Sequence, residues 1–369
     1  MAVLVARGVS VLGCPRGSNP FGDFCRGGKS GAAARARSRS AFPRAGNCGR
    51  QTPPGARPDT PGARRGAHEV TRARAPEGRV ESQVATVELL PQVDRLIQLA
   101  LEEDIGTGDR TTLVTIPASS RSGARVLAKE DLVLAGMPFF RRVFALVDPG
   151  VEVEALVADG AQVAKGTVVA RVSGATRSLL SGERTALNIL QRLTGTATLT
   201  RRFVDAVAGT GARVADTRKT DPGMRVMQKY AVRVAGGANH RFGLDSGILI
   251  KDNHVDACGG LAVAVARARQ DAPHVLKIEV EVRDLAELDA AIAAKADIVL
   301  LDNMSTEMMA EAVRRVRAQA HPIITEASGN LGLERVREVA ETGVDVLSVG
   351  ALTHSAIAAD LSMKIEAAK

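Results

Sequence analysis

Residues 216–254 read DTRKTDPGMRVMQKYAVRVAGGANHRFGLDSGILIKDNH, a stretch with nine Lys, Arg and His against four Asp. Arg218 and Lys219 follow the strand-like run 212–215, and Lys251 follows the apolar run 248–250. Both cationic groups therefore fall at the carboxyl ends of expected strands, where α/β folds place their chemistry. Such a concentration of positive charge predicts an anion-binding site.

The segment between these two strands, residues 223–234, has the pattern of a helix. Arg225, Lys229 and Arg233 recur on it at every fourth position and so share one face. This cationic stripe is equally consistent with a solvated helix face and with a wall of the anion site, and both interpretations stay open. The strand-end positions of Arg218, Lys219 and Lys251 favour a binding role for those three.

Downstream of residue 211, short apolar runs alternate with helical patterns. Strands are expected near 212–217, 247–251, 276–282, 297–302, 322–327 and 344–350, with helices at 285–294, 305–318 and 332–341. This βα alternation predicts a parallel sheet. Six units are too few for a closed eight-fold barrel of ~250 residues. We expect an α/β fold with an open, incomplete (β/α) barrel, and a doubly wound sheet is the alternative.

The run 276–282, LKIEVEV, alternates charged and aliphatic residues. Alternation puts Lys277, Glu279 and Glu281 on one face of the strand. Because both faces of a parallel sheet are normally covered, this charged face has to line a polar interior. Asp302 ends the next expected strand and adds a carboxylate at the same mouth. Carboxylates facing cations suit a metal-chelated polyphosphate or sugar hydroxyls, and a structural ion-pair network is the alternative.

Two glycine-containing loops follow the last two expected strands, EASGN at 326–330 and SVGALTH at 348–354. Glycines and helix N-termini offer free backbone N–H groups to a phosphate. Loops after the last two strands are also the usual phosphate site of barrels. We therefore expect a phosphate here.

Residues 86–197 have a different pattern. A helical apolar repeat starts near residue 87, and short alternating runs over 124–174 predict a small sheet. The acidic, glycine-rich turn at 101–109 is interpreted as a solvated turn, with a metal site as the alternative. A further helix is expected to start at Ser181, which would place Arg184 in its first turn. A cation there is disfavoured unless an anion lies nearby.

Residues 1–85 form a basic tail. Residues 1–80 carry 15 of the 49 Lys and Arg and 4 of the 41 Asp and Glu, which leaves 34 against 37 for the remainder. The net charge of +8 therefore comes from the tail and is no argument for nucleic-acid binding by the folded part. The absence of Trp, which would stack on bases, agrees with this. An Arg-, Gly-, Pro- and Ser-rich tail with little apolar pattern is expected to be disordered.

The tail also bears on location. Its Arg-rich, acid-poor composition resembles an organellar transit peptide, but a start codon assigned too far upstream gives the same pattern and is favoured. We therefore expect a cytoplasmic protein, with an organellar location as the alternative. No stretch approaches the ~20 apolar residues of a membrane span, so no membrane partner is expected. Three of the four Cys lie in the tail, and neither a disulfide framework nor a zinc site is implied.

Nine short motifs, in order along the chain, resemble those of the nicotinate-nucleotide pyrophosphorylase (carboxylating) family, also called quinolinate phosphoribosyltransferase. They are ERTALN (183–188), DTRKT (216–220), KYAVR (229–233), NHR (239–241), LIKDNH (249–254), EVEV (279–282), LDNM (301–304), ASG (327–329) and VGALTH (349–354). The resemblance covers about residues 87–369. Ala235 and Thr196 depart from the family pattern, and neither departure removes a charge.

The resemblance implies an N-terminal α/β sandwich domain (86–197) joined to an open α/β barrel (198–352). We expect residues 353–369 to form a C-terminal helix that packs back on the N-terminal domain. A homodimer or higher homo-oligomer working with Mg²⁺ is also implied. The implied reaction converts quinolinate and phosphoribosyl pyrophosphate to nicotinate mononucleotide, pyrophosphate and CO₂ for de novo NAD synthesis.

Matching motifs also imply residue roles. The side chains expected to hold the two quinolinate carboxylates are Arg184 from the neighbouring subunit, Arg218, His240, Arg241 and Lys251. The catalytic residues would be Lys219 at the pyrophosphate, with Glu281 and Asp302 at the ribose hydroxyls and Mg²⁺. The 5′-phosphate would be bound by Ser328, Gly329, Gly350 and His354. The rival interpretations are a nicotinate-specific transferase of the same fold, a paralogue tied to molybdenum transport, and a nucleic-acid-binding protein led by its basic tail. The surplus of cations favours quinolinate over nicotinate as the substrate.

Overall fold

The structure, a computed structural model, describes residues 91–366. The chain divides into two units, residues 1–75 and 76–369, and every described element belongs to the second. The expectation of a disordered tail over residues 1–85 lies outside the described residues.

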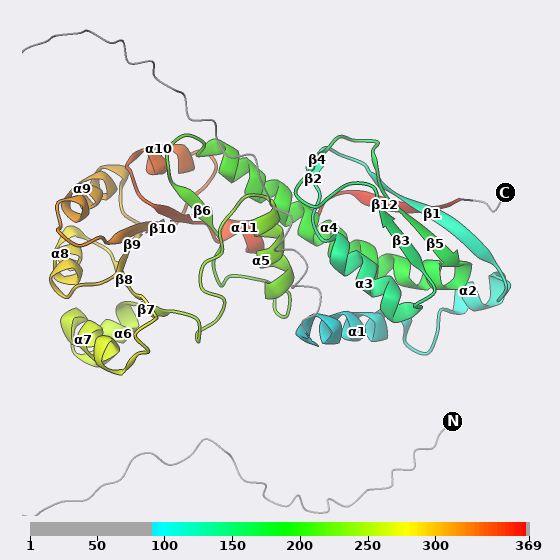
Figure 1. Cartoon of the computed structure of the whole chain (residues 1–369), viewed down its shortest axis with the longest axis horizontal. Helices are drawn as coiled ribbons and strands as arrows, with labels where there is room; N and C mark the ends of the chain where they lie inside the picture. Colours follow the sequence, from blue (N-terminus) through cyan, green and yellow to red (C-terminus); the bar gives the residue numbers. More distant parts are fainter. Residues whose placement is uncertain (1–90, 367–369) are drawn as a thin grey trace, which may run out of the picture. The chain divides into compact units, whose positions relative to one another are not determined.

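An antiparallel sheet and the helices packed on it form the N-terminal domain (Figure 1). Its elements are α1 (Pro91–Ile105), α2 (Arg110–Thr115), β1 (Arg121–Ala128), β2 (Leu132–Val133), α3 (Met137–Val147), β3 (Glu152–Ala155), β4 (Gln162–Val163), β5 (Val168–Ala175) and α4 (Thr176–Ala206). The main sheet has the order β12-β1-β5-β3, and β2 pairs with β4. Phe139, Phe140 and Phe144 of α3 are fully buried and form the centre of this core together with Leu190 of α4.

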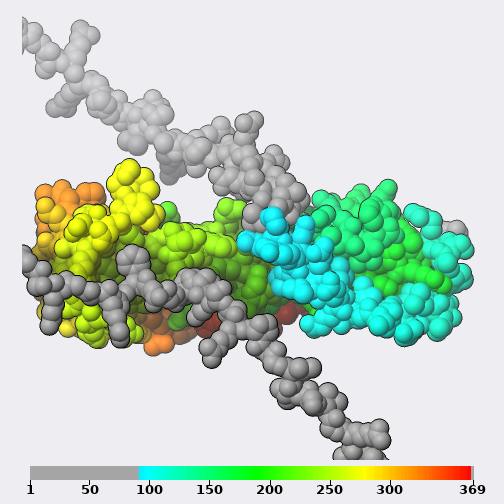
Figure 2. All heavy atoms as spheres, turned by 90° about the horizontal axis from the view of Figure 1, so that it is seen from below, coloured from blue at the N-terminus to red at the C-terminus, as the bar shows by residue number. Residues whose placement is uncertain are grey.

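The first helix lies on the surface of this domain (Figure 2). It buries Val93, Ile97 and Leu101, which recur at every fourth position and form one apolar stripe. The acidic turn that follows is a capping turn, because the Asp109 carboxylate accepts the Thr112 N–H at 3.0 Å and caps α2.

The expected helix start at Ser181 is wrong. α4 begins at Thr176 and runs without a break for 31 residues, so Arg184 lies beyond its first turn and the argument from the helix terminus does not apply. The predicted boundary between residues 197 and 198 falls inside this helix. The run of threonines does not interrupt it, because hydroxyls such as that of Thr200 donate to the carbonyl one turn back.

The expected C-terminal helix is also wrong. Residues Leu361–Glu366 form β12, which pairs antiparallel with β1 in the N-terminal sheet. Leu361 and Met363 are buried at alternate positions, the pattern of a strand with one covered face. The segment before β12 crosses α4, where Ala359 N–H donates to the Gln191 carbonyl at 3.0 Å. Packing against the N-terminal domain thus occurs through a strand.

The second half of the chain is a barrel of parallel strands. Its elements are β6 (Arg213–Ala215), α5 (Arg225–Val234), β7 (Ile248–Ile250), α6 (Asp252–Cys258), α7 (Leu261–Asp271), β8 (Ile278–Val282), α8 (Leu285–Ala293), β9 (Ile298–Asp302), α9 (Thr306–Arg317), β10 (Ile324–Ser328), α10 (Val336–Glu341), β11 (Val346–Ser348) and α11 (Ala351–His354). The six strands have the order β6-β11-β10-β9-β8-β7.

This strand order distinguishes the two predicted architectures. A doubly wound sheet reverses its strand order at an internal switch point. Here the order runs in sequence from β7 to β11, and β6 pairs with β11 as it would in a closed barrel. The two end strands, β6 and β7, are sheet edges, so the barrel is open between them (Figure 1). The prediction of an open barrel is confirmed.

Among residues 91–366, no helix combines the length and the apolar composition that a bilayer crossing requires.

Gly195 tests the crossing of α4 by the C-terminal segment. A Cβ at this position would lie 1.9 Å from the Ile357 carbonyl oxygen. Helix propensity alone predicts that Gly195→Ala stabilises the protein by ~0.5–1 kcal/mol, whereas the clash predicts a loss of about 1–3 kcal/mol. We expect the loss in urea unfolding. Gly123→Ala is the control, because its Cβ would meet its nearest neighbour at 3.8 Å. Equal gains in both variants would contradict the crossing.

Candidate active site

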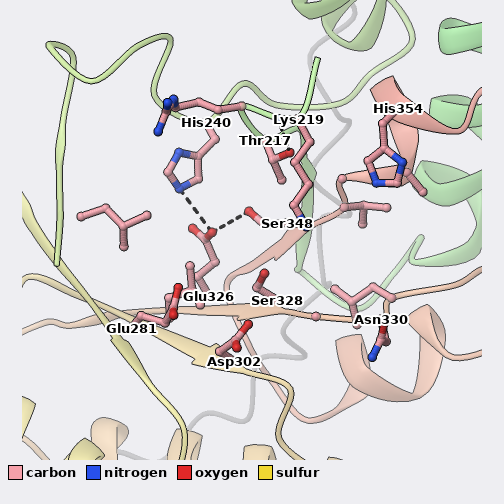
Figure 3. A pocket seen from close by; sticks show the side chains of 18 of the residues that line it. Thr217, Lys219, His240, Glu281, Asp302, Glu326, Ser328, Asn330, Ser348 and His354 are labelled. Atoms are coloured by element: carbon pink, nitrogen blue, oxygen red, sulfur yellow. Dashed lines mark hydrogen bonds and ion pairs between the residues drawn. The ribbon is translucent and has the colours of Figure 1, made fainter. Parts of the chain in front are cut away.

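A cavity of about 860 Å³ opens at the carboxyl ends of the barrel strands. Its walls come from the segments after β6, β7 and β11, from the loop after β10, and from the ends of β8, β9 and β10. Figure 3 shows side chains from these separate elements pointing into the same space. The βα repeat produces this convergence, because parallel strands bring all their carboxyl ends to one edge.

Eleven of the twelve predicted site residues line this cavity. They are Arg218, Lys219, His240, Arg241, Lys251, Glu281, Asp302, Ser328, Gly329, Gly350 and His354. The twelfth, Arg184, lies exposed on α4 and does not line the cavity.

Strand register sets the level of the polar groups inside the barrel. Ser328 of β10 is in register with Asp302 of β9 on one side and with Ser348 of β11 on the other. Because side chains alternate along a strand, Glu326 shares the inward face with Ser328, one step deeper. Polar residues therefore form a layer at the strand ends, and carboxylates lie below it.

Lys277 does not belong to this interior. It precedes the first residue of β8 and is exposed. Alternation correctly assigns its strand face, but Lys277 stands at the amino end of the strand, whereas the cavity opens at the carboxyl end. The expectation of a third charge inside the barrel is therefore wrong for this residue.

Arg241 and Arg218 form part of the cationic wall. The Arg241 guanidinium donates to the Gly247 carbonyl at 2.8 Å, which anchors it beside the loop that leads to β7. Burial, and then the nearby charge of Arg218, lower the pKa of Arg241 below the ordinary value for arginine. Positive charges that are crowded in this way gain stability when an anion binds between them.

Lys251 lines the same cavity and is paired with a carboxylate. Its Nζ donates to Glu281 Oε2 in a short ion pair. Lys251 is half-exposed, whereas the Glu281 side chain is 11% exposed. A cation predicted to bind an anion is therefore in direct contact with a carboxylate predicted to act at a sugar.

The cationic stripe on α5 does not behave as one surface. Lys229 is 4% exposed and forms an ion pair with Asp216, which is fully buried, whereas Arg233 is exposed. Burial raises the pKa of Asp216 and lowers that of Lys229, and each opposes the other's shift through its charge. The stripe is therefore neither a solvated face nor a wall of the cavity.

The Asp216–Lys229 pair also positions the turn that carries His240. The His240 N–H donates to Asp216 Oδ1 at 3.0 Å, and Lys229 Nζ donates to the His240 carbonyl at 3.0 Å. The Asn239 amide donates to the other Asp216 oxygen at 2.6 Å. A buried carboxylate whose oxygens accept several donors is a rigid support, so the backbone at His240 is fixed from below.

His240 also contacts two carboxylates that were not expected to meet it. Its Nε2 lies 3.3 Å from Glu279 Oε2 and 3.4 Å from Glu326 Oε1. The available signal was alternation, because Glu279 and Glu326 each stand two positions before a predicted site residue on the same inward face. Within the described chain, these three residues form the group whose donor atoms could also hold a metal ion.

The two glycine loops have the close approaches expected of phosphate cradles. Gly329 has φ +94°, and a Cβ there would lie 2.2 Å from Asn303 Oδ1. A Cβ at Gly350 would lie 3.0 Å from Lys219 Cδ and 3.1 Å from His354 Nε2. A side chain at either position would fill the cradle. The helix expected over residues 332–341 begins at Val336 instead, so the loop after β10 is longer than predicted.

Lys229→Met tests whether the buried ion pair supports this site. Removing one partner leaves Asp216 charged and buried, which costs about 3–5 kcal/mol. We expect the free energy of unfolding, measured by urea denaturation, to fall by that amount. Arg233→Ala, one turn along the same helix, is the matched control and should change it by less than ~0.5 kcal/mol. Equal effects of the two variants would show that Lys229 is not a structural support.

Comparisons with known proteins agree with this geometry. Family models for the C-terminal and N-terminal domains of quinolinate phosphoribosyl transferase match residues 196–364 and 109–194. A probable nicotinate-nucleotide pyrophosphorylase (carboxylating) of Synechocystis sp. is 46% identical over 274 residues, which are 74% of this chain and 92% of the relative. A mitochondrial quinolinate phosphoribosyltransferase (decarboxylating), 2a, of Nicotiana tabacum is 41% identical over 290 residues, 73% of this chain and 81% of the relative.

A solved structure is similar over the same part of the chain. The nicotinate-nucleotide pyrophosphorylase from Francisella tularensis superposes with a TM-score of 0.72 at 40% sequence identity, and the match covers 76% of this chain and 99% of that one. Since family models match both domains and relatives above 40% identity match over most of their own length, the chain belongs to the quinolinate phosphoribosyltransferase family.

Proposed function

We propose that the cavity at the strand ends is where this chain transfers the phosphoribosyl group of phosphoribosyl pyrophosphate to quinolinate. The products are nicotinate mononucleotide, pyrophosphate and CO₂, in de novo NAD synthesis. The observation that carries this proposal is the arrangement of charge: cations from the segments after β6 and β7 face carboxylates at the ends of β8 and β9 across one cavity. Both substrates are polyanions, and the reacting sugar carbon becomes positive.

Quinolinate would bind at the cationic wall. Its two carboxylates need several cations in a partly desolvated pocket, and Arg218, Arg241, Lys251 and His240 supply them. Lys251 would exchange its contact with Glu281 for one with a substrate carboxylate. Arg184 of a second subunit would complete the set, which makes a homodimer or a higher homo-oligomer the working form.

Glu281 and Asp302 would act at the ribose. As pyrophosphate leaves, C1 of the ribose takes on oxocarbenium character, and fixed carboxylates stabilise that charge more in the transition state than in the ground state. Lys219 would bind the departing pyrophosphate. The 5′-phosphate would lie in the cradle formed by Ser328, Gly329, Gly350 and His354, which fixes the sugar relative to the carboxylates.

Mg²⁺ fits the donor set at these strand ends. Asp302 and Glu281 offer carboxylate oxygens from neighbouring strands to the same cavity, and Mg²⁺ prefers one or two carboxylates together with substrate phosphates. We propose that these two residues hold the ion, with Asp302 in the larger share because Glu281 also binds Lys251. When bound, Mg²⁺ would neutralise charge on the pyrophosphate.

The proposed reaction has two steps, displacement of pyrophosphate at C1 of the ribose and loss of CO₂ from the ring. The ring nitrogen of quinolinate attacks C1 of the ribose while the bond from C1 to the pyrophosphate oxygen breaks. The ribosylated ring nitrogen is positively charged and withdraws electrons from the adjacent carbon. The carboxylate on that carbon therefore leaves as CO₂, and a proton from solvent replaces it.

We propose a cytoplasmic location for this enzyme. The mitochondrial relative in Nicotiana tabacum makes an organellar location the alternative. Microscopy of the full chain fused to a fluorescent protein at its C-terminus distinguishes the two.

A direct assay tests the proposed reaction. Purified protein with quinolinate, phosphoribosyl pyrophosphate and Mg²⁺ should release CO₂ in step with nicotinate mononucleotide. Nicotinate in place of quinolinate should release none. Glu281→Gln keeps the shape and removes the charge, so kcat should fall by about 10²-fold or more while the melting temperature changes little. Near-normal turnover in this variant would remove Glu281 from the chemistry.

Subunit mixing tests the shared site. Arg184→Ala and Lys219→Ala homodimers should each be nearly inactive. In a mixed dimer, the site on the Arg184→Ala chain keeps its own Lys219 and receives Arg184 from the other chain, so one site in two is complete. Random exchange should therefore recover about a quarter of wild-type activity for a two-fold symmetric dimer. If Arg184 served its own chain, mixing would restore nothing.

A further inference from the structure

The contacts of His240 are unusual for a residue that is expected to bind a substrate anion. Its side chain is 14% exposed, and its Nε2 points at two glutamates that are 6% and 5% exposed. Glu279 comes from β8 and Glu326 from β10, so the imidazole is fixed from two strands. Figure 3 shows the imidazole ring next to the Glu326 carboxylate, with a dashed line joining the two.

Glu326 is the better anchored of the two carboxylates. Its Oε1 accepts the Ser348 hydroxyl as well as facing His240 Nε2. The Ser348 contact therefore fixes this oxygen in place beside the imidazole. Glu279 differs, because its Oε1 is buried without a hydrogen-bond partner. Glu326 is therefore the carboxylate that is held firmly next to His240.

The charged groups around His240 come from several elements. Glu279 and Glu326 face the ring, Arg241 is its neighbour in the chain, and the Asp216–Lys229 pair contacts its backbone. Burial alone lowers the pKa of His240, but the two carboxylates outweigh it and raise the pKa to about 10.

One contact opposes this charge. The Arg241 N–H points at His240 Nδ1 at 2.7 Å, which suits a neutral ring. A single backbone N–H is weaker than two carboxylates, so the two carboxylates outweigh this contact.

We propose that Glu326 is a positioning residue for quinolinate recognition, which acts through Nε2 of His240 and does not touch the substrate. This inference rests on the function proposed above, which places His240 beside the quinolinate carboxylates. A bare glutamate at the floor of a site for a dianion would repel it. Beneath His240 and Ser348, the same charge keeps the imidazole oriented and protonated, and so it contributes to binding.

Steady-state kinetics of Glu326→Gln test the inference at the substrate. Loss of a charge-assisted hydrogen bond to His240 should raise KM for quinolinate by about 10-fold or more, with KM for phosphoribosyl pyrophosphate within about 2-fold. The ratio of variant to wild-type KM should grow from pH 7 to pH 9, because a ring with a lowered pKa loses its charge as pH rises. Ser348→Ala is a milder second variant and should shift KM in the same direction.

Two further comparisons separate this role from a structural one. Glu334→Gln removes a carboxylate of the same cavity that forms no ion pair with His240, and its quinolinate KM should show no added pH dependence. In a His240→Asn background, Glu326→Gln should not raise quinolinate KM any further, and it should lower KM to the extent that the bare carboxylate repels the dianion. A full effect in that background would show that Glu326 acts independently and would overturn the inference.

NMR of the histidine ring gives a readout that needs no substrate. The His240 signal, identified by its loss in His240→Asn, should remain that of a protonated ring to about pH 10 in the wild type. In Glu326→Gln it should titrate at a clearly lower pH. A His240 ring that titrates near the ordinary pKa of histidine in both proteins would overturn the inference. A metal ion that His240, Glu279 and Glu326 retain after dialysis against EDTA would also overturn it. If the NMR results are as expected but the protein does not turn over quinolinate, the proposed function is rejected and the contact between Glu326 and His240 stands.

Discussion

Charges inside the barrel are stable only as a set. Carboxylates on β8 and β10 face inward, and the desolvation of an unpaired charge costs several kcal/mol. Their partners come from one segment, residues 216–251, which supplies Lys251 to Glu281 and His240 to Glu279 and Glu326. The buried pair of Asp216 and Lys229 then holds that segment against the sheet. The most buried of these interactions thus support both the fold and the site, whereas the pair of Glu281 with the half-exposed Lys251 contributes little to the fold.

Much of the site was predictable because it stands at strand ends. Counting βα units was enough to predict an open barrel, since the length of a complete barrel is known. Residues at a strand end or a few positions beyond it, such as Lys219, Lys251 and Asp302, needed only the strand boundaries. Motif resemblance then supplied roles for them. Both steps use local sequence, which is why they succeeded.

The rest depends on contacts between distant segments. Helical spacing places Lys229 on a face of α5 but does not show what covers that face. Its partner Asp216 lies before α5, and the sequence does not predict the shape of the loop that joins them. The contact of His240 with Glu326 likewise joins two segments that are 86 positions apart in the sequence, and it depends on how the barrel brings β10 next to the loop before β7. Arg184 was misplaced within its helix because Ser181 is a favourable cap residue and was taken as the start. The helix in fact begins five residues earlier, at Thr176, directly after the preceding strand β5. The C-terminal strand was missed because six alternating residues are a weak signal.

The strand order of the N-terminal sheet has a consequence for how the protein is made. β1 pairs with β5 on one side and with β12, formed by the last described residues, on the other. During synthesis the N-terminal domain therefore leaves the ribosome with one edge of β1 unpaired. That edge can pair with β12 only after the whole barrel has been synthesised. An unpaired edge strand can join another chain, and native pairs so distant in sequence form slowly. During synthesis this edge of β1 thus has no partner until β12 emerges, and a chain that stops before β12 would expose an unpaired strand in its N-terminal domain.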